Sequence, residues 1–243
     1  MFIFTEKKIK ILNFALLGTL IMAIVANQAV LANTEKTVGI KQSSLFSIGS
    51  IKLFSDTKLT GNLSDDATKL SFVQGVPEKY GQELNVSFDQ VQNAIDIMKQ
   101  YDPSYGRQKI TFAGAEKQRY INIGLKIACE FCCGVSGIVF ANGEASCGCA
   151  HSQAMRGLEA YLIKNHGSEY SDDQILRELA RWKGHYFPKQ MVQKTMDQIQ
   201  SGKYTPDVAA LLLDVKLPKY GANDTKQPTQ SNIENAPAMV GGC

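Results

Sequence analysis

Five of the six cysteines in this sequence lie within residues 129–151, together with one of its three histidines. They form two arms, Cys129-Glu-Phe-Cys132-Cys133-Gly134 and Cys147-Gly-Cys149-Ala-His151. A thiolate is the softest ligand that a side chain offers, and two close cysteine pairs joined by a short segment are typical of a chain that wraps one soft or borderline metal ion. We therefore interpret this window as a metal- or redox-active thiol centre.

The spacing of the two arms suits zinc or Cu(I). Cys129-x-x-Cys132 with Cys147-x-Cys149 would supply four thiolates to a tetrahedral zinc ion, or fewer to trigonal or linear Cu(I). A purely structural zinc site has no use for a fifth adjacent thiol, so the surplus favours a metal that moves or a cluster of more than one ion. The predicted ligands are Cys129, Cys132, Cys133, Cys147, Cys149 and His151, with Met155 and Cys243 as secondary candidates.

Two other interpretations of the same cysteines stay open. One is a thiol-disulfide or metal-dependent redox protein that uses Cys129 and Cys132 as an exchange pair, although no strand-then-helix context surrounds that pair. The other is a disulfide-stabilised domain without metal, because exported cysteines often pair. Against the latter, the neighbours Cys132 and Cys133 diverge in extended backbone. An iron–sulfur cluster is disfavoured, since exported proteins rarely receive one.

The first residues predict export. Lys7, Lys8 and Lys10 precede an apolar run from Ile11 to Val25, and Val30 and Ala32 fit a signal-peptidase site. The rival is an uncleaved anchor, because residues 11–32 come close to the roughly 20 residues that span a bilayer. In both cases we expect an extracytoplasmic protein, secreted or membrane-anchored, that contacts the membrane only through this segment.

Charge argues against nucleic acid as a partner. The chain carries 26 basic and 23 acidic residues, and removal of residues 1–32 takes away three lysines and one glutamate, which leaves 23 against 22 and a net charge of +1. Nucleic-acid binding needs a concentrated basic face. The remaining length suits one domain with its own core, so the cysteines are not needed as staples.

The elements around the cysteines predict a small antiparallel sheet. Residues 120–127 alternate apolar and polar side chains, which indicates a strand that Cys129 continues. Residues 137–141 and 144–147 flank Asn142-Gly143, a strong hairpin signal that would bring the two cysteine arms together. A helix should then start at His151 or Ser152 and end at His166, with Gly167 as its left-handed cap.

Other segments complete an α+β prediction, in which the cysteine hairpin packs against three to four helices. A capping box at Ser87 predicts a helix over residues 88–100, and one at Ser171 predicts another. Pro188 and Pro206 should open two more, and Lys109–Phe112 is a further strand candidate. The predicted boundaries are 1–32 for a signal peptide or anchor, 33–71 for a spacer, 72–217 for the domain and 218–243 for a disordered tail.

Several individual side chains have two interpretations. Cys243 either folds back to add a thiolate, with Met239 nearby, or remains an exposed thiol or a pairing point to another chain. We interpret His166 and His185 as surface or capping residues, and Arg156 as an exposed helix arginine rather than a partner of the thiolates.

The motifs Cys129-Glu-Phe-Cys-Cys-Gly134, Cys147-Gly-Cys-Ala-His-Ser152 and Ala154-Met-Arg-Gly-Leu158, with Tyr161-Leu162, resemble those of an uncharacterised family of exported prokaryotic proteins. The likeness covers most of residues 75–243. It implies an exported domain built around the cysteines and carries no activity. We expect a non-catalytic protein that binds a thiophilic ion for structure, sequestration or delivery, with a metal-donor or metal-acceptor protein as a possible partner.

Overall fold

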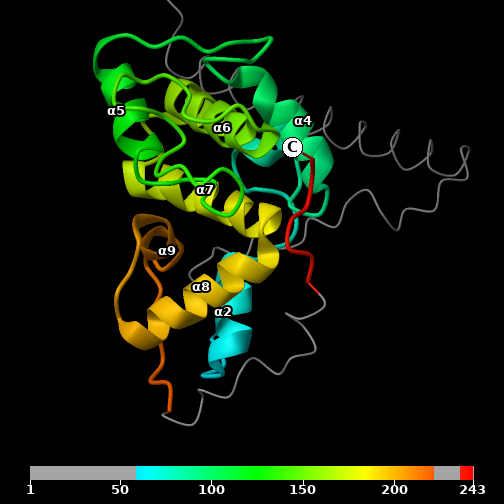
Figure 1. The fold of residues 1–243 in the computed structure, drawn as a ribbon, viewed down its shortest axis with the longest axis vertical. Helices are drawn as coiled ribbons and strands as arrows, with labels where there is room; N and C mark the ends of the chain where they lie inside the picture. Colours follow the sequence, from blue (N-terminus) through cyan, green and yellow to red (C-terminus); the bar gives the residue numbers. More distant parts are fainter. Residues whose placement is uncertain (1–58, 222–235, 243) are drawn as a thin grey trace, which may run out of the picture. The chain divides into compact units, whose positions relative to one another are not determined.

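The computed structural model describes residues 59–221 and 236–242, all within one compact unit, Leu53–Cys243. These residues are helical (Figure 1). The elements are α2 (Leu63–Ser71), α3 (Tyr80–Leu84), α4 (Val91–Met98), η2 (Lys99–Tyr101), α5 (Gly114–Gly124), α6 (Ala150–His166), α7 (Asp172–Tyr186), α8 (Pro188–Ser201) and α9 (Pro206–Leu211). The described residues contain no strand, so the predicted α+β fold with a sheet is wrong. They contain one isolated antiparallel bridge, between Val139 and Ala145.

The predicted strand over residues 120–127 is instead the end of α5 and the turn that follows it. Tyr120, Ile123 and Ile127 are buried, and their spacing of three and then four residues suits a helix as well as the alternation suited a strand. The good helix formers at 116–119 precede them and tip the balance toward a helix. The strand candidate Lys109–Phe112 is likewise irregular.

The helix that follows the cysteines, α6, lies at the centre of the fold and packs against α4, α5, α7 and η2. Its prediction from His151 or Ser152 to His166 is confirmed. A Cβ atom on Gly157 would lie 1.9 Å from the carbonyl oxygen of Met98, so glycine is what lets α6 lie directly against the end of α4. The left-handed cap predicted at Gly167 is wrong, because its φ is −61°.

The three following helices also agree with their sequence signals. The Ser171 side chain accepts a hydrogen bond from the Gln174 amide, and the Gln174 side chain accepts one from the Ser171 amide, which completes the predicted capping box of α7. Pro188 and Pro206 open α8 and α9. Residue 187 alone separates α7 from α8.

The capping box predicted at Ser87 does not form. Its hydroxyl donates to the carbonyl of Gly75 at 3.0 Å, and the helix begins later, at Val91, with no side-chain cap on Gln90. The chain then continues through η2 to Tyr101. The helix itself was therefore predicted, but its start was not.

Residues 63–71 of the predicted spacer form α2, which packs against α8. Their shared apolar cluster consists of Leu63, Ala67, Leu70, Val192, Met196 and Ile199. The predicted signal peptide or anchor, and the spacer up to residue 58, lie outside the described residues. Among the residues that are described, no helix has both the length and the apolar character needed to cross a bilayer.

Candidate metal centre

The cysteines lie on a segment that we call the cysteine loop, residues 125–149, between α5 and α6. Its first arm turns back on itself at Cys129, whose carbonyl accepts the amides of both Cys132 and Cys133 at 3.0 Å. This turn leaves the Cys129 side chain buried and the side chains of Cys132 and Cys133 exposed. The chain then returns to the body, where the Ile138 amide donates to the carbonyls of Gly124 and Ile127.

The second arm returns through the predicted hairpin, which is shorter than expected and contains no strand. The Phe140 amide donates to the Glu144 carbonyl at 2.8 Å, and the Gly143 amide donates to the Phe140 carbonyl at 2.8 Å. Gly143 has a φ of 86°, so the connection is a three-residue loop with glycine in the left-handed position rather than a two-residue turn. The Asn142-Gly143 signal therefore located the reversal correctly. Its two sides share an isolated bridge at Val139 and Ala145 and the hydrogen bonds around it, but neither side is a strand.

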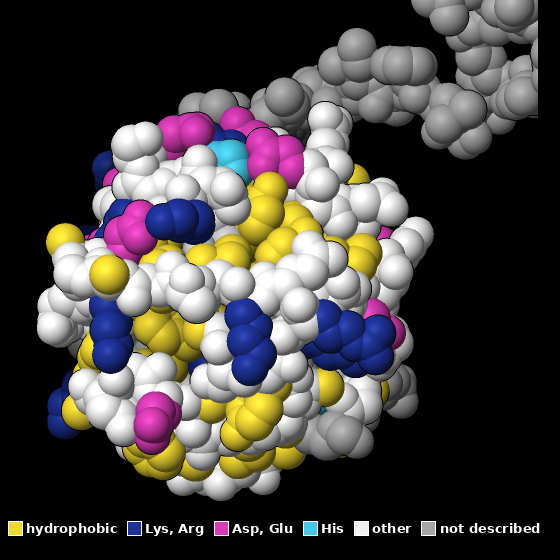
Figure 2. All heavy atoms as spheres, turned by 90° about the horizontal axis from the view of Figure 1, so that it is seen from above, with side chains coloured by type: hydrophobic (Ala, Val, Ile, Leu, Met, Phe, Trp, Pro, Cys, Tyr) yellow, Lys and Arg dark blue, Asp and Glu magenta, His cyan; other side chains and the backbone are white. Residues whose placement is uncertain are grey.

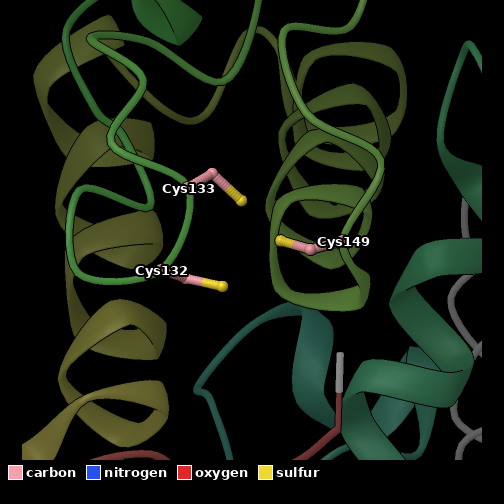
Figure 3. A group of neighbouring side chains, drawn as sticks. All are labelled: Cys132, Cys133 and Cys149. Carbon is pink, nitrogen blue, oxygen red and sulfur yellow. The ribbon is translucent and has the colours of Figure 1, made fainter.

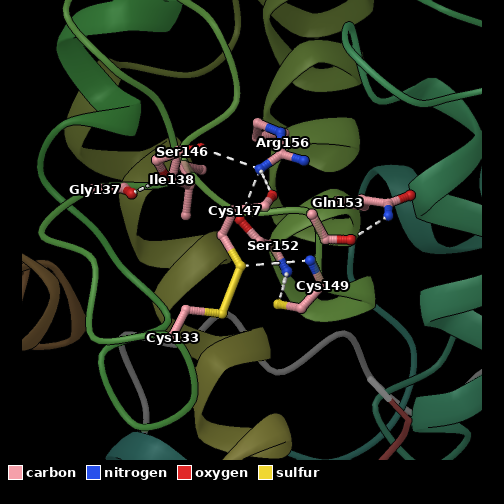
Figure 4. The surroundings of a disulfide bond; sticks show 10 residues. Cys133, Gly137, Ile138, Ser146, Cys147, Cys149, Ser152, Gln153 and Arg156 are labelled. Carbon is pink, nitrogen blue, oxygen red and sulfur yellow. Dashed lines mark hydrogen bonds between the residues drawn. A yellow bond between two sulfur atoms is a disulfide. The ribbon is translucent and has the colours of Figure 1, made fainter.

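Arg156 of α6 holds the second arm in place (Figure 4). Its guanidinium is fully buried and forms a two-point ion pair with Asp102, with Nη2 to Oδ2 at 2.6 Å and Nε to Oδ1 at 3.1 Å. Its Nη1 donates to the carbonyls of Ile138 (3.1 Å) and Cys147 (2.9 Å) and to the Ser152 hydroxyl (2.7 Å). The interpretation of Arg156 as an exposed helix residue is wrong.

Glu130 holds the first arm from the opposite side. Its carboxylate accepts from Lys183 of α7 at 3.0 Å and from Lys194 of α8 at 2.6 Å, and both lysines also bind Asp207 of α9. Although burial opposes the shift, the two lysines lower the pKa of Asp207. Lys183 also lies 5.2 Å from the ring centre of Phe131. Glu130, which follows Cys129, is thus tied directly to α7 and α8, and through the two lysines to α9.

Three sulfur atoms converge at the mouth of the cysteine loop (Figure 3). The Sγ atoms of Cys132, Cys133 and Cys149 all lie within 4.8 Å of one another. With zinc–sulfur bonds of about 2.3 Å, the sulfurs of a tetrahedral site lie roughly 3.8 Å apart, so a small contraction of these side chains would close them on an ion. Cys132 and Cys133 come from the first arm and Cys149 from the start of α6, so the structure brings both predicted arms to one Cys₃ group.

Cys133 has a second partner, because it is joined to Cys147 in a disulfide (Figure 4). The two Cα atoms are 6.9 Å apart. The Cys147 sulfur also accepts the amide of Cys149 at 3.4 Å. Cys147 was predicted as a ligand, but it is not a member of the group of three.

Cys149 caps the N-terminus of α6, where its sulfur accepts the Ser152 amide at 3.4 Å. A hydrogen bond from Cys129, then one from His151 and the one from the Ser152 amide, lower the pKa of Cys149 to about 4, although burial opposes the shift. The same hydrogen bond to Cys149, together with burial, raises the pKa of Cys129. The hydrogen bond between the two thiols thus favours the thiolate on Cys149 and the protonated form of Cys129.

His151 lies beside the Cys₃ group without belonging to it. Its Nε2 donates to the carbonyl of Val240 at 2.8 Å, its side chain is hydrogen-bonded to Cys149, and its ring packs on Tyr186 and Phe187. Its role as a ligand stays a prediction, and in this structure its side chain is hydrogen-bonded to one of the three sulfur-bearing residues. Met155, a secondary candidate one turn further along α6, is fully buried.

The Val240 carbonyl belongs to the terminal segment, residues 236–242. The Val240 amide donates to the Tyr186 carbonyl at 2.9 Å, and the Gly242 amide donates to the Gln92 side chain at 3.1 Å. This part of the predicted disordered tail therefore lies on α4 and α7, next to His151. Cys243, the secondary ligand candidate, lies outside the described residues.

Sequence reasoning missed the residues that position the sulfurs. Arg156, Asp102 and Glu130 carry no local signal, because their ion-pair partners are 53 to 64 residues away in the chain. The surplus of thiols was visible, but the pairing of Cys133 with Cys147 was not, since cysteine spacing does not determine connectivity.

The chemistry available to this arrangement follows from its donors. A Cys₃ group with two exposed members can hold a thiophilic ion, and the disulfide beside it can exchange with a thiolate. No protein family, curated protein or solved structure matches the chain. The resemblance to exported proteins with this cysteine signature therefore stays a prediction. Function is inferred below from the geometry of the Cys₃ group and its disulfide.

Proposed function

We propose that this protein binds one thiophilic metal ion, zinc or Cu(I), through the thiolates of Cys132, Cys133 and Cys149, outside the cytoplasm. The observation that carries the proposal is the approach of the three sulfur atoms to within 4.8 Å of one another. Three thiolates match the trigonal coordination of Cu(I) directly. Zinc would need a fourth donor, which Cys129, hydrogen-bonded to Cys149, could supply.

The exposure of the group favours sequestration or delivery over a purely structural role. Structural zinc sites are closed on all sides by protein ligands. Cys132 and Cys133 are exposed instead, so an ion held there would be open to another protein on one side. The proposed partner is a protein that donates or accepts the metal, reached directly at the mouth of the cysteine loop.

The proposed location rests on the basic and apolar pattern of residues 1–32, which is typical of export. Nucleic acid is not proposed as a partner. On the face in Figure 2, basic side chains are scattered among apolar and uncharged ones and do not join into one patch.

Metal analysis of the fully reduced protein, purified without oxygen, tests the proposal. We expect about one ion per chain in the wild type, and loss of most of it in Cys132→Ser and Cys149→Ser, because each variant leaves only two thiolates in the group. The matched control is Ser136→Ala, an exposed change in the same loop that should retain the ion. Metal-free wild-type protein whose clustered cysteines can be reduced would contradict the proposal.

A second candidate function is thiol–disulfide exchange, favoured by one specific observation. The Cys149 thiolate, with its pKa lowered to about 4, lies within 4.8 Å of Cys133, which is half of a disulfide. Metal-free protein that reduces a protein disulfide catalytically, with loss of that activity in Cys149→Ser, would favour this function over metal binding.

A further inference from the structure

Cys133 is a member of two groups at once. Its sulfur lies with those of Cys132 and Cys149 in the Cys₃ group, and it is also bonded to the sulfur of Cys147. A metal ligand must be a thiolate, whereas a disulfide sulfur carries no negative charge and binds metal poorly. The two uses of Cys133 therefore exclude each other.

Hydrogen bonds hold the backbone at both Cys133 and Cys147. The carbonyl of Cys147 is bonded to the buried Arg156, and the Cys133 amide is bonded to the carbonyl of Cys129. The Cα atoms of Cys133 and Cys147 are 6.9 Å apart, at the upper end of the range that a disulfide bridges. The Cys133 sulfur lies within 4.8 Å of those of Cys132 and Cys149 while it is bonded to Cys147, so it is in reach of both groups with the arms in place.

We infer that the Cys133–Cys147 pair is a redox switch on the metal site, and that Cys147 is the switch partner rather than a ligand. This inference rests on the proposed function. In the reduced state the Cys133 thiolate completes the Cys₃ group. In the oxidised state the bond to Cys147 removes the negative charge of Cys133, so only two thiolates remain and the ion is released. The switch gives a use to the thiol that exceeds the needs of a mononuclear site.

The step balances with a small-molecule disulfide, RSSR, as the oxidant. The Cys133 thiolate, which is exposed, attacks one sulfur of RSSR, forms the mixed disulfide Cys133–S–SR and releases RS⁻. The Cys147 thiol loses its proton to the released RS⁻ and attacks the Cys133 sulfur, which expels a second RS⁻. Two electrons pass from the cysteine pair to RSSR, one S–S bond breaks and one forms, and the ion leaves with its charge unchanged.

Zinc release on oxidation tests the switch. Reduced protein loaded with one zinc ion is mixed with oxidised glutathione, and free zinc is followed with a chromophoric chelator while peptide mapping locates the new disulfide. We expect the wild type to release its ion and to form Cys133–Cys147. We expect Cys147→Ser to load zinc as the wild type does and, when reduced glutathione is also present, to keep the ion under conditions in which the wild type releases it. Its mixed disulfide at Cys133 is then reversed by reduced glutathione, because no second thiol converts it to an internal disulfide.

Ser136→Ala is the control, an exposed change in the cysteine loop that removes no thiol, and it should release zinc as the wild type does. Equal release from Cys147→Ser and the wild type in the same glutathione mixture, loss of zinc loading in Cys147→Ser, or a mapped pair other than Cys133–Cys147 would each overturn the switch. If the reduced wild type binds no ion at all, the proposed function fails as well. If it binds the ion and keeps it after the disulfide forms, only the switch fails.

Discussion

The helices and the cysteine loop are positioned by different kinds of contact. We call α2, α4 and α6–α9 the helical frame. In the frame, backbones meet directly, as where Gly157 lies against the Met98 carbonyl and Gly184 against the Ser71 carbonyl, with no room for a Cβ atom. In the loop, backbone carbonyls and a carboxylate are held by single charged side chains that the frame supplies, above all Arg156, Lys183 and Lys194.

The difference shows how reactive groups can be placed without secondary structure around them. Loops carry chemistry when a rigid scaffold holds them. Here charged side chains of the helical frame hold the Glu130 carboxylate on the first arm and the Cys147 carbonyl on the second. The sulfur-bearing residues of the Cys₃ group stay exposed or half-buried. Changes in the frame should therefore alter stability, whereas changes in the loop should alter metal and thiol chemistry with little effect on folding.

The largest expected effect is at Arg156, where frame and loop meet. Arg156→Met would leave Asp102 buried without its cation and two loop carbonyls without their donor. Removal of one partner from a buried ion pair costs about 3–5 kcal/mol, so we expect a loss of that size in urea unfolding. Metal stoichiometry in the surviving folded protein should also fall, because the second arm loses its anchor.

Arg107→Met is the matched control, since Arg107 is exposed. It should change the free energy of unfolding by less than about 0.5 kcal/mol. If Arg156→Met behaves like this control and keeps its metal, then the frame does not position the loop and the comparison fails.

Acid should destabilise the helical frame through one buried histidine. Burial lowers the pKa of His185, in α7, to about 4, while its Nε2 donates to the Val73 carbonyl at 2.6 Å. In the unfolded chain this histidine has a pKa of about 6.5 and therefore binds a proton first as the pH falls. The contribution of His185 to stability is thus complete above that pH and is lost as pH falls toward 4. We expect a fall of about 2–3 kcal/mol in the free energy of unfolding between pH 7 and 4.5, measured by urea.

The fall should be smaller in His185→Gln, which keeps an amide donor but does not titrate. His166→Gln is the contrasting variant. Although burial opposes the shift, hydrogen bonds to Glu83 and Glu169 raise the pKa of His166, so its contribution is complete below the unfolded pKa and is lost as pH rises. If His185→Gln and the wild type lose stability equally, His185 does not carry the acid response of the frame.

What the sequence could predict follows the same division. The capping box at Ser171 and the prolines at the starts of α8 and α9 act within four residues, and these helices were predicted correctly. The sheet was not, because residues 120–127 satisfy the helical and strand periods equally. The good helix formers at 116–119 and the packing of α5 on α6 then favour the helix.

For the site, the sequence predicted the meeting of the two cysteine arms from the Asn142-Gly143 reversal, and the structure brings Cys132, Cys133 and Cys149 together. It could not predict which thiols pair or which stay free. That choice depends on the Arg156 and Glu130 contacts, which join residues far apart in the chain and follow no local pattern.

The smallest expected effect comes from two glycines that lie close together in sequence, one in each region. Gly157→Ala would place its Cβ atom 1.9 Å from the Met98 carbonyl oxygen, and the backbone at the end of α4 would have to shift. Overpacking of this kind costs about 1–3 kcal/mol, so we expect urea unfolding to show a loss in that range.

Gly148→Ala is its counterpart in the cysteine loop. No atom lies within 4 Å of the Cβ position there, and its φ is not in the left-handed region. We expect a change of less than about 0.5 kcal/mol, even though Gly148 stands between Cys147 and Cys149. An equal loss in both variants would mean that the loop is packed as tightly as the frame. Little change in both would mean that α6 can move away from the end of α4. The backbone contact at Gly157 would then not be what positions α6 and the Cys149 sulfur at its N-terminus.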